Sequence, residues 1–280
     1  MRRMIIVSPQ GQLANRIIHF SHFIGVALEY DFKIIHLCFD EFYPLFKKNF
    51  IACNNNNIRI ILLNNKLLQL MRKAFVKSIK LLSKFNNGRF LLFRYIYLPY
   101  GNLISDHPFP IDRDLFLNEK SRCILFDGWK FRNEYLFKKH FNVIKELFKP
   151  DESIQSLIND ELIDLKSRFD HLIGVHIRRG DYKTFMNGTY FYNDDVYINK
   201  MEWIKKSKEY KGKKLAFILC SDERVNTTHF SDFQISYIRR DPVHDLYLLS
   251  SCDCIIGPPS TFSSWASIYG QIPLVRILSG

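Results

Sequence analysis

Short apolar runs alternate with amphipathic stretches along the chain, and this pattern predicts an α/β protein. Short runs rich in β-branched residues are typical of buried strands, and apolar positions at helical spacing are typical of helices. The first half is predicted to contain strands at 5–7, 33–39, 58–63 and 123–126, a loop at 11–16, helices at 17–30, 66–85 and 133–148, and an irregular aromatic segment at 90–110.

The second half repeats the same alternation. Its predicted strands lie at 172–177, 215–219, 235–238 and 254–256, and its predicted helices at 151–169, 196–210, 243–251 and 261–269. Lys149-Pro150-Asp151 breaks the helical pattern between the halves. Strands alternating with helices form open parallel sheets. We therefore expect two α/β domains, 1–150 and 151–280, with the active site in the cleft between them.

Three predicted strands of the second half end in polar clusters. These clusters are Arg178-Arg179-Gly180-Asp181, Ser221-Asp222-Glu223 and the loop 257–263, which contains Ser260, Thr261 and Phe262. Ligands of open α/β sheets bind outside the carboxyl ends of the strands. The three clusters therefore mark the predicted ligand site.

The paired arginines suit a diphosphate, because each guanidinium is a planar fork of donors that stays charged. The alternative is a surface pair with Asp181 as its counter-ion. Ser260 and Thr261 precede a predicted helix, whose first amides and dipole favour an anion. Either hydroxyl could instead cap that helix. Taken together with Arg178, the loop is better explained as part of a diphosphate site.

The sequence does not decide the roles of two other titratable residues, Asp245 and His176. Asp245 opens a predicted helix, where it either caps the helix or accepts hydrogen bonds from a base such as guanine. His176 lies in a strand, where a lone histidine is usually a satisfied core residue. The sequence has no histidine, aspartate and glutamate cluster at metal-ligand spacing, so no metal is expected.

The formal net charge of +12 implies attraction to anions, whether nucleic acid, phosphorylated substrates or a membrane surface. No nucleic-acid-binding motif occurs, and no nucleic-acid partner is expected. Six scattered cysteines without a CxxC pair favour reduced, buried thiols. The amino-terminal apolar run, 4–7, is too short for a signal sequence, and no apolar run is long enough to span a bilayer. We expect a cytoplasmic protein.

Residues 66–85 form a basic amphipathic segment. Lysines occupy a stripe beside an apolar helical face, which consists of Leu67, Leu70, Met71, Ala74, Phe75, Ser78, Leu81, Leu82 and Phe85. Such a helix can dock peripherally on an anionic membrane. The alternative is a domain helix with a solvated lysine face.

The segment 174–182, Gly-Val-His-Ile-Arg-Arg-Gly-Asp-Tyr, resembles the signature of the α-1,2-fucosyltransferases, and its arginine motif is shared with α-1,6- and protein O-fucosyltransferases. Residues 11–16 are similar to that family's amino-terminal glycine-rich motif, with Ala14 and Arg16 as departures. Residues 127–137 and 245–265 also resemble family segments, although Pro258-Pro259 departs from the pattern.

The resemblance implies a GT-B-like fold of two Rossmann-like domains and inverting transfer of L-fucose from GDP-fucose, without a metal, to a sugar hydroxyl such as galactose O2 of a glycan or surface polysaccharide intermediate. It implies that the second domain binds the donor and the first faces the acceptor. In that comparison Arg178 holds the diphosphate and Arg179 supports it. The remaining implied donor contacts are His176, Asp245, Ser260, Thr261 and Phe262.

Asn15 matches a family residue near the transferred sugar. Asp181 and Glu134 are the candidate general bases, and Asp222 joins the predicted donor site from its strand end. Two alternatives remain open: the same fold with another nucleotide-sugar donor, and a non-catalytic basic binding protein.

Overall fold

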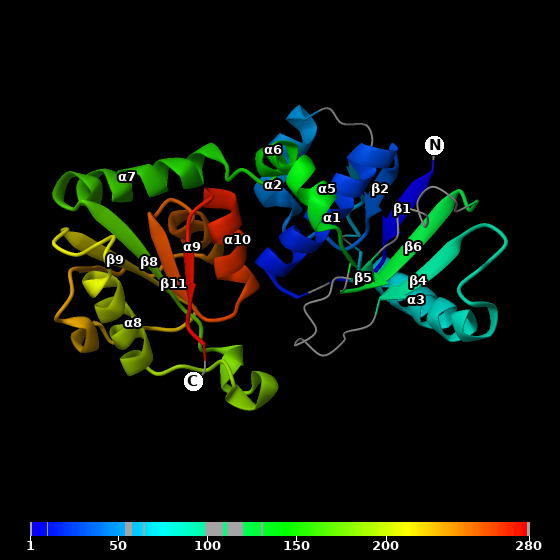
Figure 1. The fold of residues 1–280 in the computed structure, drawn as a ribbon. Helices are drawn as coiled ribbons and strands as arrows, with labels where there is room; N and C mark the ends of the chain where they lie inside the picture. The colour runs from blue at the N-terminus through cyan, green and yellow to red at the C-terminus, as the bar shows by residue number, and fades with distance from the viewer. Residues whose placement is uncertain are drawn as a thin grey trace. The chain divides into compact units, whose positions relative to one another are not determined.

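The computed structural model describes residues 2–9, 11–53, 58–63, 65–98, 109–110, 120–129 and 131–278. The chain divides into two compact units, Met1–Lys149 and Pro150–Gly280. Each unit is built around a five-stranded sheet whose paired strands run parallel (Figure 1).

The sheet of the first unit has the order β3-β2-β1-β6-β4, and a two-stranded pair, β5-β7, accompanies it. The elements of this unit are β1 (Arg3–Ile6), α1 (Leu13–Tyr30), β2 (Lys33–His36), α2 (Tyr43–Ala52), β3 (Ile58–Ile60), α3 (Lys66–Asn86), β4 (Arg94–Leu98), β5 (Phe109–Pro110), β6 (Cys123–Gly128), β7 (Phe131–Arg132), α5 (Glu134–Lys139) and α6 (Phe141–Leu147).

The core of the first unit is largely aromatic and lies around α1. Phe20 and Phe23 are fully buried, and Phe23 stacks on Phe131 with ring centroids 3.6 Å apart. Gly25 allows α1 to approach α5 closely, since a Cβ there would lie 2.8 Å from the Leu136 carbonyl oxygen. A larger residue at this position would separate the two helices.

Several boundaries in the first unit differ from the sequence prediction. Helix α1 begins at Leu13, inside the predicted loop 11–16, and α2 was not predicted. Strand β4 lies within the segment predicted to be irregular; residues 99–108 of that segment lie outside the described residues. The predicted helix 133–148 divides at His140, which leaves helical geometry and contacts Glu29 at 2.9 Å.

Helix α3 confirms the helix predicted at 66–85, but its packing is unusual. Its one fully buried residue is Ile79, and the nine residues of the predicted apolar face are all exposed. Among the described helices, none is both long and apolar enough to cross a membrane.

The second unit has the sheet order β10-β9-β8-β11-β12. Its elements are α7 (Glu152–Arg168), β8 (His171–Ile177), the short 3-10 helices η1 (Asp181–Lys183) and η2 (Phe185–Gly188), α8 (Asp194–Lys206), β9 (Leu215–Ser221), η3 (Thr227–Phe230), β10 (Ile235–Ser236), α9 (Pro242–Leu249), β11 (Cys254–Gly257), α10 (Thr261–Gly270) and β12 (Leu274–Arg276).

Helices cover both faces of this sheet. Ile173, Val175 and Ile177 of β8 join the core cluster that contains Tyr197 and Met201 of α8. Alternate strand residues point to opposite faces, and a Cβ on Gly174 would meet Leu249 of α9. His176 therefore faces the α9 side of the sheet, with Gly174.

Strand β12 was not predicted, and β9 and β11 extend to Ser221 and Gly257, beyond their predicted ends. Helix α8 begins earlier than predicted, because the Asn193 side chain accepts the Val196 N–H and caps it. The longer strands carry the polar clusters directly at their carboxyl ends.

Candidate active site

The three predicted polar clusters lie at the carboxyl ends of adjacent parallel strands, β9, β8 and β11. From β8 the chain continues to β9 and β10 on one side, then returns to β11 and β12 on the other. Figure 1 labels β9, β8 and β11. This reversal between β8 and β11 is a topological switch point, the place where open α/β sheets bind ligands.

The turn after β8 is held by Asp222 from the end of β9. Its carboxylate accepts the N–H of Arg179 at 3.0 Å and that of Gly180 at 3.1 Å. A Cβ on Gly180 would lie 2.8 Å from Asp222 Oδ2, so only glycine fits without moving that carboxylate. Asp222 therefore shapes the turn that carries the two arginines.

Arg178 is the guanidinium that faces the site. Its Nη2 lies 2.7 Å from Asp181 Oδ1 and its Nη1 lies 3.2 Å from Asp222 Oδ2. Its side chain is 25% exposed and lies above the Tyr182 ring, with Cζ 5.6 Å from the centroid. Two carboxylates thus orient the fork and leave part of it open to an anion.

Arg179 points elsewhere. Its Nε donates to the Tyr192 carbonyl at 3.1 Å, and its Nη2 pairs with Asp194. Burial opposes ionisation of Asp194, but hydrogen bonds from His229 and Arg179 hold its pKa below the usual value. The structure therefore does not bring the two guanidiniums together as one double fork; Arg179 anchors the loop between β8 and α8.

Tyr182 links the arginine turn to the loop after β11. Its hydroxyl donates to the Pro259 carbonyl at 2.9 Å. Burial raises its pKa, so the phenol stays protonated. The turn that carries Arg178 and the amino end of α10 are therefore neighbours, as the diphosphate interpretation requires.

Ser260 caps α10 by accepting the Phe262 N–H at 3.2 Å. Thr261 is the first residue of the helix, and both residues are half-buried. The capping alternative is thus correct for Ser260. A capped helix still presents its positive end to an anion.

The His176 ring stacks on the Phe262 ring. Their ring centroids are 4.9 Å apart and the planes are inclined by 29°. His176 Nδ1 is buried and has no hydrogen-bond partner among the described residues. Burial, with a smaller effect from Arg178, lowers the pKa of His176 to about 3. The imidazole is neutral at physiological pH, and its buried Nδ1 has no partner in the described structure.

Asp245 lies in a buried ionic cluster beneath the sheet end. Asp241, rather than Asp245, caps α9 by accepting the N–H groups of Val243 and His244. Asp245 contacts Arg240 at 3.4 Å, and Arg240 also pairs with Glu161 of α7. Burial raises the pKa of Asp245 to about 6, although Arg240 opposes the rise.

Asn15 and Glu134 belong to the first unit. Asn15 lies in the first turn of α1, where a Cβ on Gly11 would come within 2.3 Å of its Nδ2. Gly11 has φ +62°, so it suits both the backbone conformation and this close approach. Glu134 is the first residue of α5 and lies 3.6 Å from His22 Nε2.

Sequence patterns missed Tyr182, Asp194, Arg240 and Glu161. Tyr182 had a signal, because it directly follows the arginine cluster. Arg240 and Glu161 are 79 residues apart in the chain, and neither lies in a recognisable motif. Their pairing depends on how α7 and α9 pack.

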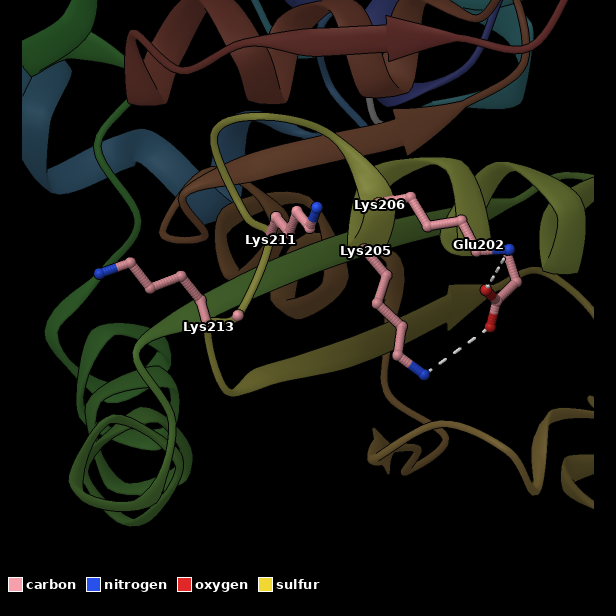
Figure 2. A pocket seen from close by; sticks show the side chains of 6 residues that line it. Glu202, Lys205, Lys206, Lys211 and Lys213 are labelled. Atoms are coloured by element: carbon pink, nitrogen blue, oxygen red, sulfur yellow. Dashed lines mark ion pairs between the residues drawn. The ribbon is translucent and has the colours of Figure 1, made fainter.

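In the described part of the chain, no group of three or more histidine, cysteine, aspartate or glutamate side chains could hold a metal ion. A basic pocket lies elsewhere in the second unit (Figure 2). It is lined by Glu202, Lys205, Lys206, Lys211, Gly212 and Lys213. Gly212 and Lys213 precede β9, so this lysine pocket is at the amino end of that strand, away from Asp222.

His176 is expected to stay neutral in solution. Its imidazole resonances should not titrate between about pH 5 and 8, because burial lowers its pKa to about 3. An NMR titration, assigned by comparison with the His176→Phe variant, measures this. A midpoint near the usual histidine pKa would show that water reaches the His176 ring and that the ring is not stacked on Phe262.

Comparison with known proteins supports a relationship to glycosyl-transferring enzymes. The model of the family described as "Glycosyl transferase family 11" matches residues 127–275, more than half of the chain. A search of the curated proteins finds no match.

Three of the matching solved structures illustrate the shared fold. A mutant of Arabidopsis thaliana FUT1 in complex with GDP has a TM-score of 0.66 and 14% identity, covering 98% of this chain and 70% of that one. POFUT1 in complex with GDP-fucose has a TM-score of 0.56 and 11% identity, covering 99% and 98%. The α-1,6-fucosyltransferase NodZ, co-crystallised with GDP, has a TM-score of 0.54 and 14% identity, covering 99% and 95%; NodZ structures come from Bradyrhizobium.

These likenesses confirm the predicted fold class, an α/β protein with two Rossmann-like units of the GT-B type. The family match confirms the resemblance noted in the sequence.

Proposed function

Because this chain belongs to glycosyl transferase family 11, we propose that it transfers L-fucose from GDP-fucose to a sugar hydroxyl, with inversion at the anomeric carbon. The observation that carries the proposal is that Tyr182 joins the turn that carries Arg178 to the loop before α10, at the switch point of the second sheet. The fold shared with POFUT1, crystallised with GDP-fucose, supports this donor.

In this proposal the second unit binds the donor and the first unit contributes to the acceptor side. The Arg178 fork binds the diphosphate from one side, and the amino end of α10, with Ser260 and Thr261, binds it from the other. Asp222 keeps Arg178 in position. Arg179 supports the site indirectly, by fixing the loop that follows the turn.

His176, Phe262 and Asp245 are proposed to contact the rest of the donor. The unpartnered Nδ1 of His176 can accept a hydrogen bond from a sugar or ribose hydroxyl. Asp245 has a pKa of about 6 and is therefore mostly ionised at neutral pH. An ionised carboxylate accepts hydrogen bonds, and guanine offers two neighbouring donors.

The reaction places growing negative charge on the departing GDP. In this proposal Arg178 and the α10 dipole lie where that charge develops, and electrostatic stabilisation of this kind lowers the barrier without a proton donor. Asn15 is proposed to lie near the transferred sugar, and Asp181 or Glu134 to accept the acceptor's proton. The proposed acceptor atom is galactose O2, giving an α-1,2 linkage in a glycan or surface polysaccharide intermediate.

Incubation with GDP-fucose and galactose-terminated acceptors is expected to release GDP, at the same rate with and without EDTA. Arg178 and α10 are proposed to supply the positive charge that a metal supplies in other enzymes. Release of GDP is measured by a coupled assay. An EDTA-sensitive rate would contradict the metal-free proposal.

Nucleotide competition tests the donor. GDP should compete with GDP-fucose, whereas UDP should compete poorly, if Asp245 recognises guanine. If GDP and UDP compete equally well with GDP-fucose, a different nucleotide-sugar donor would be favoured. If no acceptor releases GDP and calorimetry detects no GDP binding, the transferase proposal fails.

A further inference from the structure

Helix α3 packs on the unit through the face opposite its apolar face. The packed face consists of Gln69, Arg72, Val76, Ile79 and Ser83, which follow one another at spacings of three or four residues. Arg72 Nη1 donates to the Val7 carbonyl at 2.6 Å, and Ile79 joins a small core with Val7. The helix is therefore fixed to the sheet without using most of its large side chains.

The opposite face is largely exposed in the described structure, although Phe75 makes a ring contact with Phe93, with centroids 6.4 Å apart. Its large members are Leu67, Leu70, Met71, Phe75, Leu81, Leu82 and Phe85, and their exposed fractions run from 51% for Phe75 to 86% for Phe85. Leu91, in the loop after the helix, is 99% exposed and Leu92 is 78% exposed. So many exposed apolar side chains on one helical face are typical of an interaction site.

The charges on α3 indicate an anionic partner. The helix carries five lysines and Arg72, and its sequence contains no aspartate or glutamate. Lys73, Lys77 and Lys84 are exposed and lie beside the apolar face. A second copy docked on this face would bring like charges together. An anionic bilayer surface instead complements both the lysines and the apolar side chains.

We infer that α3 docks in the interface of an anionic lipid bilayer, with its apolar face among the acyl chains and its lysines among the headgroups. This docking surface comprises α3 and the adjoining Leu91 and Leu92. It involves none of the residues proposed to bind the donor, so its test is independent of the transferase proposal.

Co-sedimentation of the full chain with lipid vesicles tests the inference. We expect binding at low salt to vesicles of phosphatidylcholine with phosphatidylglycerol, and none to phosphatidylcholine alone. The charge variant Lys73→Gln/Lys77→Gln/Lys84→Gln should weaken binding about a hundredfold, since each lysine near an anionic surface contributes about fivefold.

The apolar variant Leu70→Gln/Leu81→Gln/Phe85→Gln should weaken binding at least about tenfold, since it removes buried apolar area. All six positions are exposed, so folding should survive, and the melting temperature Tm checks this.

Two variants in the second unit are matched controls. Lys205→Gln/Lys206→Gln/Lys213→Gln removes three lysines from the lysine pocket (Figure 2). Leu157→Gln/Ile163→Gln/Trp203→Gln removes three exposed apolar side chains. Both controls should bind anionic vesicles as the wild type does.

Three results would overturn the inference. The first is no binding to anionic vesicles at low salt. The second is an equal loss in the lysine-pocket control, which would make binding a matter of net charge alone. The third is a wild-type dimer that the apolar variant converts to a monomer, which would show that a second copy covers α3.

Discussion

Arg178→Lys is expected to lower kcat/KM for GDP-fucose by about a hundredfold to a thousandfold, the usual effect of losing one group that stabilises transition-state charge. Lysine keeps the charge but loses the planar fork, which in this structure is held by Asp181 and Asp222. Initial rates of GDP release measure the effect. The folded state should persist, because Arg178 follows the carboxyl end of β8 and its side chain is partly exposed.

The matched control is Arg239→Lys, the same chemical change at an exposed arginine of the same unit. It should leave kcat/KM unchanged. Near-normal turnover by Arg178→Lys, or an equal loss in the control, would remove Arg178 from the proposed chemistry.

Arg240→Met is expected to destabilise the protein by about 3–5 kcal/mol at neutral pH, because removing one partner of a buried ion pair leaves its charges uncompensated. The Arg240 side chain is only 3% exposed and lies between Glu161 and Asp245. Methionine fills much of the same volume but satisfies neither carboxylate. Chemical denaturation measures the loss in unfolding free energy, and Arg239→Met provides the exposed control.

The unfolding free energy lost in Arg240→Met should be larger at high pH than at low pH. Burial raises the folded pKa of Asp245 to about 6, above the unfolded value of about 4. The protonated form therefore favours folding, and this contribution disappears as the pH rises through about 6. Arg240 lowers that pKa, so its removal should cost more at pH 8 than at pH 5. A pH-independent loss would show that the charge on Asp245 is not what Arg240 compensates.

The strand ends were predictable because they depend on local pattern. The apolar runs that stop at Arg178, Asp222 and Pro258 mark buried strands. Because these strands are parallel, their carboxyl ends lie together on one side of the sheet. This reasoning located the candidate site without any knowledge of side-chain contacts.

The role of each side chain was less predictable. Adjacent residues leave a strand in opposite directions, and the apolar and polar pattern does not decide whether Arg178 or Arg179 faces the loop after β11; only the family resemblance singled out Arg178. The structure places Arg179 against Asp194. Asp241 precedes α9 and Asp245 lies in its first turn, and only the hydrogen bonds in the structure show that Asp241 is the cap.

The same limit applies to α3. Its periodicity correctly predicted a helix and an apolar face, but periodicity does not show which face packs. Arg72 reaches the Val7 carbonyl and Cys38 from the other side of the helix. Long-range contacts such as these determine the orientation, and they have no signature in a local window of sequence.

A crystal structure of the protein with GDP tests the central claim most directly. We expect the diphosphate oxygens within hydrogen-bond distance of the Arg178 guanidinium and of the amino end of α10. A diphosphate bound in the lysine pocket of Lys205, Lys206, Lys211 and Lys213, with Arg178 still paired only to Asp181 and Asp222, would contradict the account.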